Sequence, residues 1–111
     1  MAKLTPEQAL NLYVDYLLPD FDSLAYLEYN LEHDAIHSPL MITVEANTSV
    51  TTDFYRVFFI VDNTTDITIS EDTARVIRQY GDRYIIAAMS EHNNIVVKNN
   101  LSNKTIIGGA F

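Results

Sequence analysis

The spacing of apolar residues changes at Pro39, and this change constrains the fold more than any other feature of the chain. Before Pro39, apolar residues recur every three or four positions, as in a helix with one buried face. From Leu40 onward, Ile42 and Val44 alternate with polar residues, which is typical of a strand with one buried face. We therefore expect helices first and a mainly antiparallel sheet of about five strands after them, an α+β fold.

The first helix has a clear start and end. Thr5 and Gln8 have the spacing of a capping box, and Pro6 lies at the first helical position, where its missing N–H costs nothing. Pro19 forces the residue before it out of the helical region. The helix should therefore cover about residues 6–18.

A second helix is predicted between this helix and Pro39. Asp20 or Asp22 can cap its N-terminus, and Ser38-Pro39 ends it. Its apolar stripe consists of Leu24, Leu27, Leu31 and Ala35. The two helices should form an N-terminal hairpin that packs on the sheet.

The strands are predicted from β-branched and aromatic runs. The run from Phe54 to Val61 is almost continuously apolar, so it should be a central strand covered on both faces, with Phe54, Phe58 and Phe59 in the core. Other strands are expected at about 40–46, 66–69, 84–89, 95–98 and 105–107, the last at a sheet edge.

One further helix is predicted at residues 71–80. Ser70 resembles an N-cap, Glu71 and Asp72 complement the positive end of a helix, and Gly81 can supply a left-handed C-terminal residue. Residues 108–111 should be a flexible tail. The 111 residues, 48% of them hydrophobic, fit one compact domain over 1–111.

Charge is distributed unevenly along the chain. Residues 1–55 contain nine acidic residues and one basic residue, whereas residues 56–111 contain six of each, so the net charge of −8 belongs to the first half. We interpret this half as a docking surface for a basic partner, because complementary potential accelerates and selects encounters. The predicted contact residues are Asp15, Asp20, Asp22, Tyr26, Glu28, Tyr29, Glu32 and Asp34.

Each of these features also has a simpler interpretation. An acidic surface keeps a small protein soluble. Tyrosines on amphipathic helices often pack at a core edge rather than at an interface, and both interpretations apply to Tyr13, Tyr16, Tyr26 and Tyr29. Direct binding to DNA or RNA is not expected, since phosphate contacts need a basic stripe, and Arg75, Arg78 and Arg83 are too few for one.

No catalytic, cofactor or metal site is predicted. Cysteine is absent, which excludes disulfides and thiolate ligands. His33 and His37 have the spacing of two ligands on one helix face, but the helix ends near them and no third ligand is recognisable. Asp20 and Asp22 are better explained as turn and cap residues than as an acid–base pair. Without a signal peptide or a membrane span, the expected location is the cytoplasm.

Two classes of function remain open. The first is a non-enzymatic interaction protein, a small acidic inhibitor or adaptor that docks on a basic surface of a partner protein. Where that surface binds nucleic acid, the spaced carboxylates and tyrosines would imitate the nucleic-acid backbone. The alternative is a small-molecule-binding or small catalytic domain, with a pocket between helices and sheet formed by tyrosines, Arg56 and histidines. A homodimer could form through the edge near residues 105–107.

Overall fold

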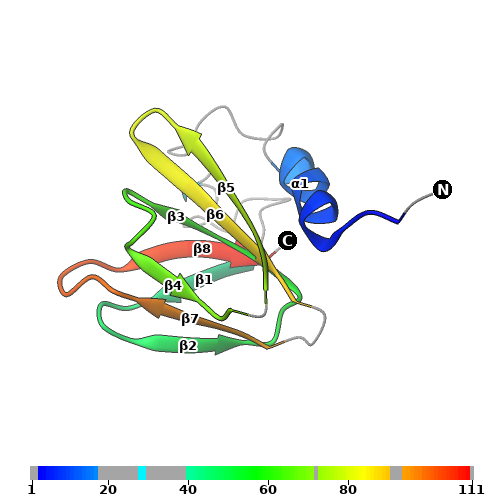
Figure 1. Ribbon diagram of the computed structural model, residues 1–111. Helices are drawn as coiled ribbons and strands as arrows, with labels where there is room; N and C mark the ends of the chain where they lie inside the picture. Colours follow the sequence, from blue (N-terminus) through cyan, green and yellow to red (C-terminus); the bar gives the residue numbers. More distant parts are fainter. Residues whose placement is uncertain (1–2, 18–27, 30–39, 72, 91–93, 111) are drawn as a thin grey trace.

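The computed structural model describes residues 3–17, 28–29, 40–71, 73–90 and 94–110 (Figure 1). Its elements, in chain order, are α1 (Pro6–Leu17), β1 (Leu40–Val44), β2 (Ser49–Thr52), β3 (Arg56–Val61), β4 (Ile67–Ile69), β5 (Ala74–Tyr80), β6 (Arg83–Met89), β7 (Ile95–Asn99) and β8 (Ile106–Ala110).

The eight strands form two antiparallel sheets. The larger sheet has five strands in the order β1-β8-β3-β6-β5, and the smaller has three in the order β2-β7-β4. β3 lies at the centre of the larger sheet, where Phe59 is opposite Ile86 of β6 on one side and Gly108 of β8 on the other. Helix α1 packs against β5 and β6 (Figure 1).

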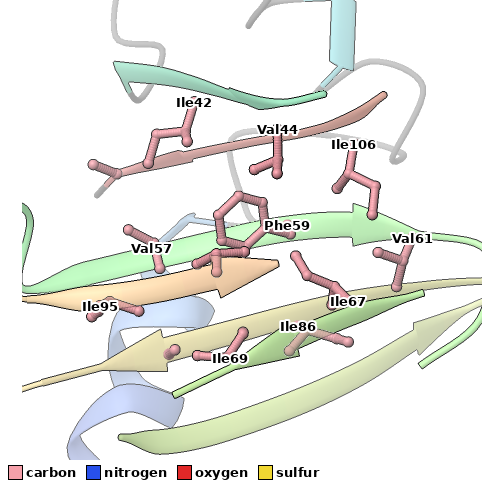
Figure 2. Packing of buried hydrophobic residues seen from close by; sticks show 13 residues of the cluster. Ile42, Val44, Val57, Phe59, Val61, Ile67, Ile69, Ile86, Ile95 and Ile106 are labelled. Atoms are coloured by element: carbon pink, nitrogen blue, oxygen red, sulfur yellow. The ribbon is translucent and has the colours of Figure 1, made fainter. Parts of the chain in front are cut away.

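The main core lies between the two sheets, and a second core lies under α1. Because side chains alternate along a strand, Phe59 points into the first core, where β4 and β7 contribute Ile67 and Ile95 (Figure 2). Phe58 belongs to the second core and packs with Leu10 of α1. β3 is therefore buried on both faces, as its apolar run predicts.

Helix α1 begins with the predicted capping box. The backbone N–H of Gln8 donates to Thr5 Oγ1 at 3.2 Å, and the N–H of Thr5 donates to Gln8 Oε1 at 2.9 Å. These two bonds satisfy donors that a helix start leaves unpaired. Leu10 and Val14 form the fully buried face of the helix.

The predicted helical hairpin and single sheet do not fit the structure. The part of the chain that the structure describes has one helix among its elements, and its strands form two sheets. Of the second predicted helix, at 20–38, the structure describes Glu28 and Tyr29, both helical, and the remaining residues lie outside the described ranges. The turn predicted at Asn47 is present, with Asn47 at a φ of 58°, but the strand that follows it, β2, was not predicted.

The helix predicted at 71–80 is wrong, because residues 74–80 form strand β5. Val76 and Ile77 are β-branched and favour a strand. Gly81, at a φ of 64°, lies at the first position of the two-residue turn that pairs Tyr80 with Arg83. Hairpin turns favour glycine there, so the residue interpreted as a helix end instead closes a hairpin.

The predicted edge strand and tail near the C-terminus are also wrong. β8 lies between β1 and β3, and residues 108–110 are buried within it. A Cβ at Gly108 would lie 2.0 Å from the backbone oxygen of Phe58. Glycine at this position therefore allows close strand packing. Because β8 pairs on both sides, it offers no free edge to a second copy.

Candidate binding hollow

Three of the eight predicted contact residues lie in the part of the chain that the structure describes. They are Asp15, Glu28 and Tyr29. The side chain of Tyr29 is 56% exposed. The remaining five, Asp20, Asp22, Tyr26, Glu32 and Asp34, lie outside the described residues, as do His33, His37 and His92.

Asp15 takes part in an ion pair with the sheet. Its Oδ1 accepts a hydrogen bond from Arg78 of β5 at 2.5 Å, and the same guanidinium donates to Asn11 Oδ1 at 3.1 Å. The hydrogen bond to Asp15 raises the pKa of Arg78 above its ordinary value. This pair fastens α1 to the strand beneath it.

Glu28 belongs to a chain of four charged residues that includes Arg83, the first residue of β6. Arg83 pairs with both Glu28 and Asp62, and Asp62 in turn pairs with Lys104 at 2.7 Å. Burial opposes the charge of Arg83, but its bonds to Glu28 and Asp62 raise its pKa. The hydrogen bond from Lys104 lowers the pKa of Asp62. Asp15 and Glu28 are thus engaged within the molecule.

A hollow of about 760 Å³ lies where α1 meets the start of β3. Its most prominent contact joins Arg56 to Tyr13 of α1, with the guanidinium carbon 3.8 Å from the ring centroid. This is a cation–π distance. The lining consists of Tyr13, Asp53, Phe54, Tyr55, Arg56, Met89, Ser90 and Ala110.

Strand pairing determines the position of the hollow. Arg56 is the first residue of β3 and by alternation shares the α1-facing side with Phe58. Its register partner is Met89, the last residue of β6. The N–H of Ser90 donates to the backbone oxygen of Tyr55 at 2.9 Å, so the loop between β2 and β3 is held against the end of β6.

Exposed aromatic rings surround the hollow. Tyr55 is 58% exposed, Tyr13 39% and Phe54 36%. Asp53, also exposed, adds a carboxylate. Tyrosine, arginine, phenylalanine and methionine are the residue types enriched at the centres of protein interfaces. The arrangement can therefore bind a partner group by stacking and charge.

The sequence anticipated only part of this site. Tyr13 was one of the tyrosines with both a core and an interface interpretation, and Arg56 was predicted to line a pocket between helix and sheet. Phe54 was assigned to the core, and the prediction is wrong because β3 begins after it, at Arg56. Tyr55 was missed because it lies inside the strand predicted from Phe54 to Val61, whereas β3 begins at Arg56.

No known protein family matches this chain, and neither a curated protein nor a solved structure shows significant similarity to it. Within the described residues, three or more acidic, histidine or cysteine side chains do not cluster as a metal site would require. In the same ranges, no helix has the length and apolar character needed to cross a membrane.

Proposed function

We propose that this chain is a non-enzymatic protein–protein interaction domain, an acidic inhibitor or adaptor, and that the hollow is its principal contact surface. The observation that carries the proposal is the gathering of three exposed aromatic rings, Tyr13, Phe54 and Tyr55, around a concave site with Arg56. Exposed apolar groups cost free energy in water, and partner binding can recover it.

The partner is a basic protein. The chain carries a net charge of −8, so its field attracts positive surfaces and repels nucleic acid. Asp15 and Glu28 contribute to this field although each has an internal partner. In this proposal the acidic first half steers the encounter, and the hollow provides the close contact.

The test is affinity capture from cell extract with two matched double variants. Phe54→Ser with Tyr55→Ser removes aromatic rings from the hollow. Ile77→Ser with Val96→Ser changes two residues that are 53% and 42% exposed and do not line it. We expect a basic partner that binds wild type and the control but not the hollow variant, with binding weakened at high salt. Equal capture by both variants would contradict the proposal.

The same hollow supports a second candidate function, binding of a small molecule. Its volume of about 760 Å³ is within the range of ligand sites. A metabolite that raises the melting temperature of wild type and the control variant, but not of the hollow variant, would favour this function over the first.

A further inference from the structure

We propose that the hollow receives an arginine side chain of the partner, through the carboxylate of Asp53 and the exposed rings of Phe54 and Tyr55. This inference rests on the proposed function and specifies the chemistry of its contact. It follows from three observations. The guanidinium of Arg56 already stacks on a ring in the hollow, Asp53 has no ion partner among the described residues, and the loop that contains Tyr55 is held by a hydrogen bond from Ser90.

The first observation is that the hollow already binds a guanidinium on an aromatic ring. Arg56 lies 3.8 Å from the centroid of Tyr13. Stacking of this kind is worth about 0.5–1 kcal/mol at exposed sites. Tyr55 offers a second ring that is more exposed than Tyr13. An incoming guanidinium can therefore use Tyr55 and Phe54 while Arg56 remains on Tyr13.

The second observation is that Asp53 has no ion partner among the described residues. The acids in the ion pairs of the described chain are Asp15, Glu28 and Asp62, all paired with bases from β5, β6 or the loop before β8. Asp53 is exposed and lines the hollow. The net charge of −8 makes the approach of a cation to this carboxylate favourable.

Arginine fits these groups better than lysine. A planar guanidinium stacks on aromatic faces and donates two parallel hydrogen bonds to one carboxylate, whereas an ammonium is a compact and strongly hydrated charge. Asp53 and Tyr55 are close neighbours in the sequence and lie on the same loop. The backbone oxygen of Tyr55 accepts a hydrogen bond from the N–H of Ser90, which holds this loop in place. The site is thus ordered before binding, which lowers the entropic cost.

The experiment is a titration of the isotope-labelled protein with a capped peptide of alternating arginine and alanine, followed by amide chemical shifts. Parallel titrations use lysine or the neutral isostere citrulline in place of arginine. Asp53→Asn is compared with Asp82→Asn, which removes an exposed acid from the turn between β5 and β6. Circular dichroism confirms that both variants fold.

We expect the arginine peptide to shift the amides of residues 53–56 and 89–90, and Asp53→Asn to weaken binding about tenfold. Asp82→Asn should change it less than about twofold. Binding by citrulline equal to that by arginine would overturn the role of charge. Equal binding by lysine would overturn the choice of arginine. If the arginine peptide shifts amides near other acidic residues, and Asp53→Asn leaves those shifts unchanged, the proposed position of the site is wrong.

The two proposals fail differently. If partner capture depends on Phe54 and Tyr55 but the arginine peptide does not shift residues 53–56, the proposed function stands and the arginine inference is wrong. If capture is independent of these rings, the proposed function is wrong, and the inference falls with it even if the peptide binds.

Discussion

Replacing Gly108 with alanine should destabilise the protein strongly. The added Cβ would lie 2.0 Å from the Phe58 oxygen and 2.5 Å from Cδ1 of Phe59, both on β3. Carbon atoms without a bond between them prefer about 3.5–4.0 Å, so β8 and β3 must separate by roughly 1 Å or more. Phe58 and Phe59 are fully buried in two different cores, so neither core can absorb this movement without loss of packing.

Overpacking of a well-packed core costs about 1–3 kcal/mol, and occasionally more. Here the clash is with backbone, so we expect a loss of about 3 kcal/mol or more. For a chain of this size that corresponds to roughly 12 °C in melting temperature. Gly81→Ala is the matched control: nothing lies within 4 Å of its Cβ, and only the φ of 64° opposes it. That strain costs about 1–2 kcal/mol.

The assay is urea unfolding followed by far-ultraviolet circular dichroism. With a urea slope of about 1–3 kcal/mol/M, the midpoint of Gly108→Ala should fall by about 1 M or more, and further than that of Gly81→Ala. A variant that is unfolded without urea would meet the same expectation. A midpoint within about 0.3 M of wild type would refute the central placement of β8 and favour a flexible tail at this position.

Two further predictions concern single polar groups. The lowered pKa of Asp62, caused first by the Lys104 hydrogen bond, means that its stabilising contribution is present above its unfolded-state pKa and is lost as pH falls through the folded value. Asp62→Asn should therefore lower the free energy of unfolding at pH 7 by less than about 1 kcal/mol, and its stability should fall less steeply than that of wild type below about pH 4. Thermal unfolding measured from pH 7 to pH 2.5 checks this. A pH profile identical to that of wild type would contradict it. Thr52 is 5% exposed, and its Oγ1 has no hydrogen-bond partner among the described residues. Thr52→Val should therefore raise the free energy of unfolding by about 1 kcal/mol. Thr51→Val, at an exposed position of the same strand, is the control. Loss of stability on urea unfolding of Thr52→Val would show that the hydroxyl does have a partner.

Local sequence signals predicted the elements whose determinants lie within a few residues. The capping box of Thr5 and Gln8 defined the start of α1, and the apolar run before Asp62 identified β3 as a strand buried on both faces. Alternation at Ile42 and Val44 identified β1. These patterns could be recognised in the sequence because the residues that form each of them lie within a few positions of one another.

The candidate site was less predictable, because its parts come from distant segments. Tyr13 and Arg56 are 43 positions apart, and the loop that contains Tyr55 is fastened by Ser90. The ion pair of Asp15 with Arg78 spans 63 positions, so a search for partners along one helix could not find it. The acidic first half was correctly counted from the sequence, but which acids already have a basic partner depends on the tertiary structure.

The sequence alone determined the order of helix and sheet, the burial of β3 and the excess of acid in the first half. Tertiary structure decided that residues 74–80 are a strand and that Gly108 lies in the middle of a sheet. Gly81 fits a helix end and a hairpin turn almost equally well, and only the pairing of β5 with β6 distinguishes the two. A glycine gives no sign of whether its missing side chain provides flexibility or space. The physical reason is the same in both cases: strand pairing and close packing depend on neighbours that the chain brings together only when it folds.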